Sequence, residues 1–349
     1  AEVIASVNHM MAENYGNPSA LHRRGLEAEH AVKKARSQVS ALFNTGNHDL
    51  IFTSGGTESN NLAIFGSLAT ARDTSRPLVT SSIEHPSVLN IFKHLEKIGR
   101  KVIYIRTDPQ GFIDLEDLKK ALDEHPAVVS IMTVNNEIGS IQPIAEIARL
   151  IETSDNKPVF HTDAVQAFGK IPIKLKAWGI DAFSISGHKL HGPKGIGVLY
   201  IDSKLKVNPI IYGGWQERGF RSGTENVPGI IGLGKAVELM DKNFEKEQNH
   251  VRNLKLYFID RLQEIDKIRI NSPYEYSSPY ILNVSFEHVR GEVLLHYLEK
   301  KGIYVSTTSA CSSKSHKGSR VLRELGLTDS QIEGAIRFCF SYEITKEDI

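Results

Sequence analysis

The chain reads VFHTDAVQAFGKIPIKLKAWGIDAFSISGHKLHGPKGIGVLYI from residue 159 to residue 201. Three short apolar runs in this stretch, at 159–162, 182–186 and 197–201, predict β-strands. Asp163 directly follows the first run, and Lys189 follows the second among small and polar residues. Ligands bind beyond the carboxyl ends of the strands in open α/β sheets. The stretch therefore predicts an α/β fold and places two candidate site residues at strand ends.

Short β-rich runs alternate with amphipathic helical runs over residues 49–201. This alternation is typical of a mostly parallel sheet with helices on both faces. We expect seven strands, at 50–53, 78–82, 101–105, 128–133, 159–162, 182–186 and 197–201. We expect helices at 58–70, 86–98, 115–122 and 144–152.

The length of 349 residues exceeds what one core of ordinary size fills, so we expect a large domain and a smaller one. A long helical pattern at 229–265 is followed by two further strand runs, near 281–286 and 304–306. The predicted large α/β domain covers 12–234. The predicted small α+β domain covers 235–349 together with 1–11, and it contains Cys311.

The charge is nearly balanced, with a formal net charge of +1 and 24% charged residues. This balance argues against a nucleic-acid-binding surface, an acidic tail or disorder, and favours a small-molecule ligand. Two cysteines are too few for a disulfide framework and indicate a reducing compartment. We find no membrane-spanning run and no signal peptide, so we expect a soluble, cytoplasmic protein whose ends are trimmed.

Lys189 is a candidate for covalent attachment of a cofactor, because few lysines have neighbours as small as Ser186 and Gly187. Pyridoxal phosphate (PLP) needs such a lysine and a carboxylate on its ring nitrogen, which Asp163 offers. Gln166 is placed to bond the ring hydroxyl. Alternatively, Asp163 caps the next helix. A metal site is a further alternative, although its candidate ligands lack a recognised spacing. Those ligands are His161, Asp163, His188 and His191.

Residues 54–60, SGGTESN, predict a phosphate-binding turn, because glycines let backbone N–H groups approach an anion and a helix N-terminus attracts it. The turn lacks P-loop and dinucleotide-binding patterns. A plain glycine turn with a Thr or Glu cap is the alternative. His85 either stacks on a ligand ring or acts as a cap or surface residue. Asn135 and Asn136 either bond a ligand or stabilise a turn.

The loop at 213–226 contains two arginines, hydroxyl groups and several glycines. Such a loop can clamp an anion, in its own site or in that of a neighbouring subunit. The alternative is an ordinary polar crossover between the two domains.

Taken together, these motifs resemble the PLP-dependent cysteine desulfurases of the NifS/IscS type, in the class V aminotransferase group with fold type I. The resemblance covers the whole chain. It is carried, in family order, by Gly16-Asn17-Pro18-Ser19, residues 53–60, Glu84-His85, residues 134–139, Asp163-Ala164-Val165-Gln166, Ser186-Gly187-His188-Lys189, residues 192–197, Arg221-Ser222-Gly223-Thr224 and Ser309-Ala310-Cys311.

The resemblance implies that Lys189 forms the Schiff base with PLP, that His85 stacks on the ring, and that Asp163 and Gln166 bond the ring nitrogen and hydroxyl. It implies a homodimer, in which one phosphate ligand comes from the partner subunit's Thr224. The other implied phosphate ligands are Gly56, Thr57, Ser186 and His188.

The resemblance also implies that Asn136 and Arg337 position L-cysteine, Arg337 through its carboxylate and Asn136 beside the cofactor as well. Cys311 is then the sulfur acceptor. The products are L-alanine and a Cys311 persulfide, which passes to an acceptor protein for iron–sulfur cluster assembly or tRNA thiolation. Polar and cationic residues flank Cys311 and favour its thiolate.

Other assignments stay open. A different class V PLP enzyme, such as a selenocysteine lyase or an aminotransferase, shares Lys189 and Asp163 but does not require Cys311. A sulfur-transfer scaffold without turnover is a second alternative. Cys339 is expected to be a small core residue, or else a second thiol near the substrate.

Overall fold

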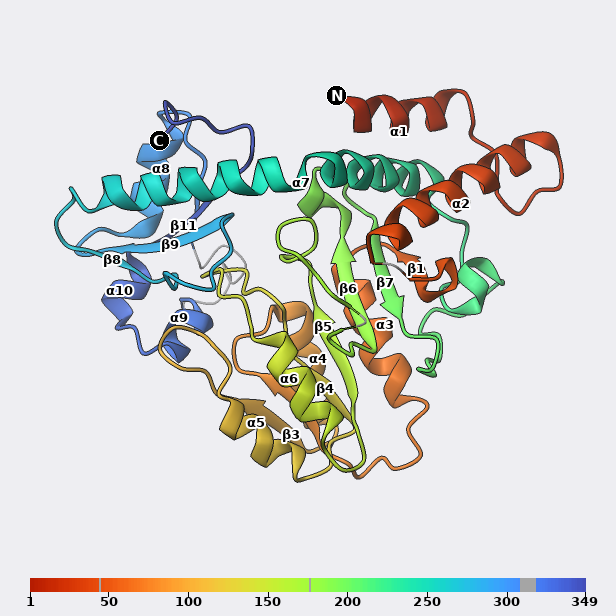
Figure 1. Ribbon diagram of the computed structural model, residues 1–349, viewed down its shortest axis with the longest axis horizontal. Coiled ribbons are helices and arrows are strands. Elements are labelled where there is room, and N and C mark those ends of the chain that lie inside the picture. Colours follow the sequence, from red (N-terminus) through yellow and green to blue (C-terminus); the bar gives the residue numbers. More distant parts are fainter. Residues whose placement is uncertain (44, 176, 308–317) are drawn as a thin grey trace.

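The computed structural model describes residues 1–349 except 44, 176 and 308–317. Within the described residues, the strands form a seven-stranded and a four-stranded sheet (Figure 1). The larger sheet contains β1 (Leu50–Thr53), β2 (Leu78–Ser81), β3 (Val102–Ile105), β4 (Val128–Ser130), β5 (Val159–Asp163), β6 (Ala182–Ser186) and β7 (Gly197–Ile201). The smaller one contains β8 (Ile268–Ile270), β9 (Ile281–Phe286), β10 (Ser306–Thr307) and β11 (Ala335–Cys339).

Helices flank both sheets. The α-helices are α1 (Glu2–Ala12), α2 (Arg23–Phe43), α3 (Gly56–Leu68), α4 (Pro86–Lys97), α5 (Leu115–Leu122), α6 (Ile144–Glu152), α7 (Val227–Leu262), α8 (Gly291–Glu299), α9 (Arg320–Glu324) and α10 (Asp329–Glu333). Short 3-10 turns lie at Asn47–Asp49, Gly187–Leu190 and Gln216–Gly219.

The large sheet has the strand order β1-β7-β6-β5-β4-β2-β3, in which only β7 runs against its neighbours. The four residues of β1, and likewise those of β2, are all buried, as expected for parallel strands covered on both faces. The predicted α/β fold, with a mostly parallel seven-stranded sheet and a smaller α+β part, is confirmed. Because β1 to β6 point the same way, their carboxyl ends meet at one edge.

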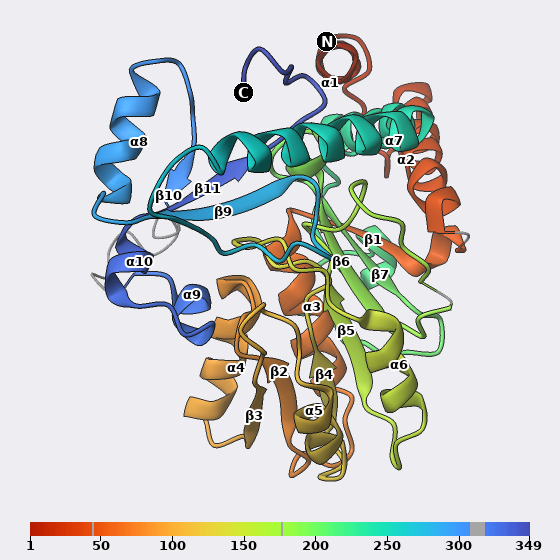
Figure 2. The same ribbon diagram turned by 60° about the vertical axis from the view of Figure 1, so that its left-hand side comes forward.

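Helix α7 links the two sheets. At 36 residues it is about 54 Å long, and it lies across the top of both sheets in Figures 1 and 2. Its first half, with Ile230 and Leu233, packs in the core of the large sheet, and its second half, with Leu254 and Leu262, packs on the small one. The division at residue 234 stays a prediction, since one continuous helix joins the two cores.

Several elements were not predicted. In α2 the buried positions are often small, such as Ala28 and Ala35, so its apolar pattern is weak. Strand β11 was missed as well. It carries Cys339, which is exposed, so its expected place in the core is wrong. Side chains alternate along a strand, and Cys339 lies on the opposite face from Phe338, which packs against Phe258 of α7.

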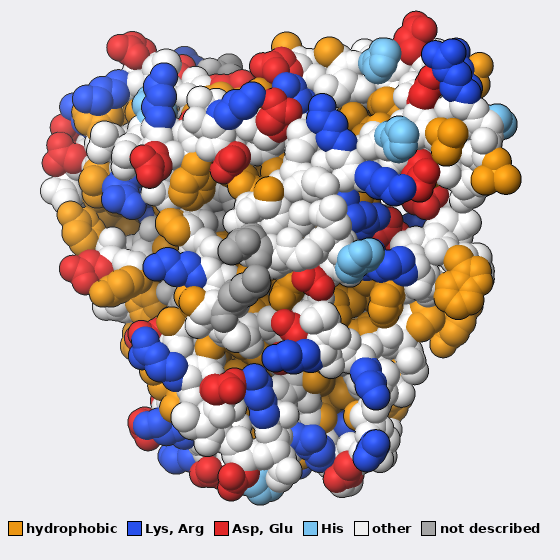
Figure 3. Space-filling view, turned by 45° about the vertical axis from the view of Figure 1, so that its right-hand side comes forward, with side chains coloured by type: hydrophobic (Ala, Val, Ile, Leu, Met, Phe, Trp, Pro, Cys, Tyr) orange, Lys and Arg blue, Asp and Glu red, His pale blue; other side chains and the backbone are white. Residues whose placement is uncertain are grey.

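None of the described helices is long and apolar enough to cross a membrane. On the face shown in Figure 3, acidic and basic side chains are interspersed, in keeping with the small net charge.

A buried ion pair connects the loop at 213–226 to helix α2 and strand β1. Arg36 of α2 donates from Nη1 and Nη2 to the Glu217 carboxylate, at 3.0 and 2.5 Å. Glu217 also accepts the backbone N–H of Phe52 in β1 at 2.9 Å, and its side chain is only 3% exposed. The positive φ of Glu217, 46°, is therefore held in place by three hydrogen bonds to two other elements.

We expect Glu217→Ala to lower the free energy of unfolding by about 3–5 kcal/mol, because it leaves the Arg36 guanidinium buried without its counter-ion. Urea unfolding followed by circular dichroism measures the change. The control is Glu116→Ala, which removes an exposed partner of Lys119 and should cost about 0–1 kcal/mol. Equal effects of the two variants would refute the structural role of Glu217.

Candidate active site

A cavity of about 240 Å3 lies where the carboxyl ends of β2, β4, β5 and β6 meet the N-terminus of α3. Most of the predicted site residues line it, namely Gly56, Thr57, His85, Asn136, Asp163, Gln166, Ser186, His188, Lys189 and Arg337. Thr224 does not line it and is exposed. Cys311 lies outside the described residues. The structure thus brings together residues that lie up to 281 positions apart in the sequence, the separation of Gly56 and Arg337.

The turn before α3 has the form of an anion cradle. Gly55 has a φ of 154°, which residues other than glycine avoid. It is the N-cap of α3 and therefore provides no side chain to cap the helix. A Cβ on Gly56 would lie 2.6 Å from Val165, so only glycine fits here. The Thr or Glu cap, which was the alternative for this turn, is absent at this helix start, although Glu58 does accept the N–H of Ser54. The helix N-terminus, with its partial positive charge, therefore adjoins the cavity.

Asp163 is a buried carboxylate at the end of β5, with 5% exposure. Its Oδ1 accepts the backbone N–H of Val165 at 3.0 Å, and its Oδ2 accepts Asn60 Nδ2 at 2.8 Å. Burial raises the pKa of Asp163, while these two donors and the nearby His85 and Lys189 counteract the rise. Asp163 thus both caps the following turn and presents a supported carboxylate to the cavity.

Gln166 is held by a lysine that the sequence analysis did not identify. Lys170 Nζ donates to Gln166 Oε1 at 2.9 Å and lies 5.7 Å from the ring centre of Tyr280. Burial lowers the pKa of Lys170 to about 8. When Lys170 is charged it can only donate, so the Gln166 oxygen faces it and the Gln166 amide N–H groups are left for the cavity.

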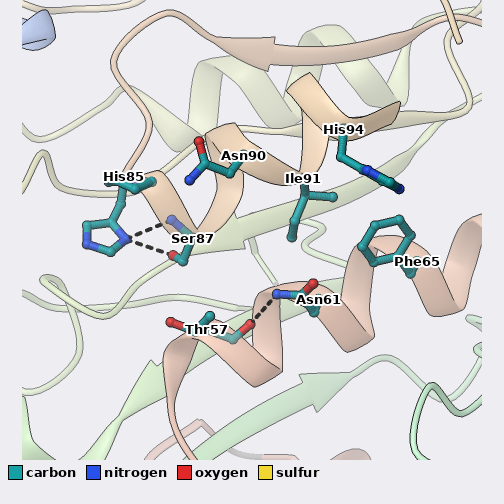
Figure 4. A pocket seen from close by; sticks show the side chains of 9 residues that line it. Thr57, Asn61, Phe65, His85, Ser87, Asn90, Ile91 and His94 are labelled. Atoms are coloured by element: carbon teal, nitrogen blue, oxygen red, sulfur yellow. Dashed lines mark hydrogen bonds between the residues drawn. The ribbon is translucent and has the colours of Figure 1, made fainter. Parts of the chain in front are cut away.

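His85 is a helix cap, one of the alternatives for this residue, and it also lines the cavity. It is the N-cap of α4, and its Nδ1 accepts the backbone N–H of Ser87 at 3.1 Å. Its ring also lines both the site cavity and a neighbouring cavity of about 580 Å3, which Figure 4 shows. Burial lowers the pKa of His85.

The two asparagines after β4 have different roles. Asn135 stabilises the turn, since its Oδ1 accepts the N–H groups of Glu137 and Ile138 at 2.8 and 3.0 Å. Asn136 lines the cavity, and its buried Oδ1 has no hydrogen-bond partner. Arg337 Nη1 donates to the Asn136 carbonyl at 2.9 Å, while the buried Arg337 Nε lacks a partner. A ligand with a carboxylate and an amine would satisfy both unpaired atoms.

The histidines proposed as metal ligands point to separate partners. His161 is 1% exposed and bonds Ser130 and Ser184 through its two ring nitrogens, and burial lowers its pKa to about 3. His188 bonds Ser186 at 2.8 Å, and His191 packs against Tyr342. In the chain outside residues 44, 176 and 308–317, no three His, Cys, Asp or Glu side chains lie close enough to hold a metal ion.

The two arginines of the loop at 213–226 bind their own chain. Arg218 donates to the carbonyls of His48 and Leu50 at 2.6 and 3.1 Å. Arg221 forms an ion pair with Glu58 at 2.9 Å. Neither lines the cavity, so the expected anion clamp does not form within the described part of this chain.

Sequence reasoning missed two further supporting residues. Asn60 is fully buried and donates to both Asp163 and Ser87. Glu84 accepts Ser81 Oγ at 2.6 Å and the N–H of Met132 at 2.8 Å, which joins the ends of β2 and β4, and burial raises its pKa to about 8. Both belong to quoted motifs, but their contacts depend on neighbouring strands.

Comparisons with known proteins agree with this geometry. A family model described as aminotransferase class-V matches residues 1–349. A cysteine desulfurase IscS from Dictyoglomus turgidum is 42% identical over 349 residues, which cover 100% of this chain and 88% of that protein.

Solved structures show the same likeness. A NifS-like protein superposes with a TM-score of 0.93 at 37% identity, covering 99% of this chain and 92% of the other. SspA in complex with cysteine superposes with a TM-score of 0.87 at 32% identity, covering 99% and 96%. Since the family model and these relatives match essentially the whole length, the chain belongs to the class-V aminotransferase family, in its group of cysteine desulfurases of the NifS/IscS type.

Proposed function

We propose that this protein is a PLP-dependent cysteine desulfurase, which takes the sulfur from L-cysteine and leaves L-alanine. The observation that carries the proposal is that Lys189, Asp163 and Arg337 line one cavity beside the glycine cradle of α3. PLP requires an amine for its attachment and a carboxylate at its ring nitrogen. An amino acid substrate requires a cation, such as a guanidinium, for its carboxylate. The proposal agrees with the similarity of this chain to a relative named cysteine desulfurase IscS.

The residues present fit PLP. The uncapped N-terminus of α3, with Gly56, Thr57, Ser186 and His188 beside it, suits the phosphate. Asp163 suits the ring nitrogen, since its two donors favour the ionised carboxylate. The amide N–H groups of Gln166, left unpaired by Lys170, suit the ring oxygen. His85 is placed to cover a ring face.

The substrate is held by the small sheet and the turn after β4. The unpaired Arg337 Nε and the unpaired Asn136 Oδ1 are complementary to the carboxylate and amine of an amino acid. Both atoms are buried, so an amino acid in this position displaces water from the cavity.

When bound, PLP supplies an aldehyde that joins an amine and a ring that accepts electrons from the adjacent carbon. The chain contributes the proton movements: Lys189 Nζ takes the α-proton of the substrate, and Asp163 keeps a proton on the ring nitrogen. Lys189 then returns a proton to the product. Asp163 and His85 line the same cavity as Lys189.

Cys311 is the proposed sulfur acceptor. Its thiolate attacks the substrate sulfur, the substrate carbon–sulfur bond breaks, and the carbon fragment keeps the electron pair and gains a proton as L-alanine. The transferred sulfur stays on Cys311 as a persulfide. The described residues on either side of 308–317 lie beside the site, which supports this role. Ser306 pairs with Arg337, and Ser319 Oγ donates to Glu137, which follows Asn136 in the turn after β4.

The acceptor of the persulfide and the assembly of the protein are further proposals. We propose a homodimer, because Thr224 is exposed in its own chain and completes the phosphate site only if it comes from a partner subunit. We propose that an acceptor protein removes the persulfide in a cytoplasmic setting, for iron–sulfur cluster assembly or tRNA thiolation.

Lys189→Ala should abolish alanine formation from L-cysteine, because it removes the group that attaches to PLP and moves the α-proton. Alanine and sulfide are quantified after incubation with PLP and L-cysteine, and the PLP absorbance of the purified protein is recorded. Lys204→Ala, an exposed lysine away from the cavity, is the control and should behave as wild type. Wild-type turnover by Lys189→Ala would refute the proposed mechanism.

Cys311→Ser should retain the yellow colour of bound PLP but lose sulfide release, because the serine hydroxyl cannot accept sulfur. Cys339→Ser is the matched control, and its activity should stay at the wild-type level. If Cys311→Ser releases sulfide at the original rate, the protein is another class V enzyme. If loss of activity follows Cys339 instead, the acceptor is misassigned.

Arg337→Ala should raise KM for L-cysteine by about 10- to 100-fold, the loss of a hydrogen bond to a charged group. Steady-state kinetics separate this effect from one on kcat. Arg323→Ala, which removes an exposed ion pair with Asp329, is the control and should leave KM unchanged. An unchanged KM in Arg337→Ala would place the substrate carboxylate elsewhere.

A further inference from the structure

A chain of hydrogen bonds connects Asp163 with His85 through Asn60, which supports the Asp163 carboxylate, and Ser87, to which the proposed reaction assigns no role. Asn60 Nδ2 lies 2.8 Å from Asp163 Oδ2 and 2.9 Å from Ser87 Oγ. Ser87 Oγ in turn lies 2.8 Å from His85 Nδ1. Figure 4 shows the end of this chain, where Ser87 approaches a single nitrogen of the His85 ring.

The direction of the last bond follows from the backbone. The Ser87 N–H can only donate, and it lies 3.1 Å from His85 Nδ1. Nδ1 is therefore an acceptor without a proton. The Ser87 hydroxyl must then donate to Nδ1 as well, and its oxygen is free to accept.

The other end of the chain gives the same direction. An ionised Asp163 carboxylate only accepts, so Asn60 must face it with its amide nitrogen. That nitrogen carries two protons, one for Asp163 and one for Ser87. The Asn60 Oδ1 is buried without a partner, which shows that the Asn60 side chain is placed by its two donated bonds.

We propose that Ser87, oriented by Asn60, is a positioning residue that keeps the His85 ring neutral with its proton on Nε2. The proposal rests on the proposed function in one respect, namely that His85 covers the PLP ring. In Figure 4 the Nε2 side of the ring points away from Ser87. His85 then offers an N–H donor there and adds no positive charge beside Asp163.

The charges that face His85 favour this state on balance. Burial lowers the pKa of His85, the Asp163 carboxylate raises it, and Lys189 and Arg337 lower it again. The two donors to Nδ1 act in the same direction as burial, because they stabilise the unprotonated nitrogen. A neutral ring leaves the Asp163 charge available to the ring nitrogen of the cofactor.

Nitrogen NMR of the full chain labelled with 15N-histidine tests the proposal, with and without bound PLP. His85→Gln identifies the His85 signals. In the wild type, Nδ1 should give the shift of an unprotonated nitrogen and Nε2 that of a protonated one. A protonated Nδ1 near neutral pH would overturn the proposal.

Ser87→Ala removes one donor to Nδ1, so the pKa of His85 should rise by about 0.5–1 unit. The acidic limb of the pH–rate profile should move upward by a similar amount. Ser87→Thr keeps the hydroxyl and should restore both values. Ser67→Ala is the matched control, since Ser67 is a buried serine of α3 that bonds only carbonyls of its own helix.

An unchanged His85 pKa in Ser87→Ala would overturn the proposal, whatever the activity. Failure of the proposed function has a different signature, because no variant or wild type would then form alanine, while the NMR shifts would still report the His85 proton. A rise in pKa shared by Ser67→Ala would show a general loss of packing and would also overturn the role of Ser87.

Discussion

The site depends on keeping a carboxylate ionised inside the protein. Asp163 is almost fully buried, and burial alone would drive it towards its neutral form. The fold compensates with donors from two elements, the turn after β5 and helix α3, and with the nearby Lys189. Because Asn60 also orients Ser87 and thereby His85, the support of one charge organises the groups around it.

A second constraint is that Arg337, the proposed substrate-binding residue, comes from the small sheet. Arg337 lies on β11, and its guanidinium reaches the Asn136 carbonyl of the large domain. Other bonds join the same two parts: Asn283 of β9 donates to the Glu137 carbonyl, and the Ser278 N–H donates to the Gly139 carbonyl. Lys255 of α7 holds this segment of the small part, because it donates to the Ser277 hydroxyl and the Ser278 carbonyl. Burial lowers the pKa of Lys255 to about 8. The hydrogen bonds that Lys255 donates are therefore strongest below that pH, where the amine is charged. The cavity is therefore shaped by contacts between the two sheets.

Two residues for which the sequence left alternatives open act as caps and also line the cavity. His85 caps α4 and lines the cavity, and Asp163 caps a turn and faces the site. The physical reason is common to both: the start of a helix or turn after a parallel strand lies at the ligand edge of the sheet. A side chain that caps a helix or turn in this position accepts a backbone N–H and at the same time faces the cavity.

The sequence by itself determined the order of the seven strands of the large sheet and of the helices α3 to α6 between them, because short apolar runs such as that of β1 are clear in the sequence. It also identified the residues at the strand ends, since chain order and polarity reveal them. Only the tertiary structure decided how they are supported. Asn60 meets Asp163 across 103 residues, and Arg36 meets Glu217 across 181. Such partners depend on sheet register and domain packing, which local patterns do not encode. For the same reason Cys339 was misplaced, because the face of a strand that reaches solvent is set by what packs on its neighbours.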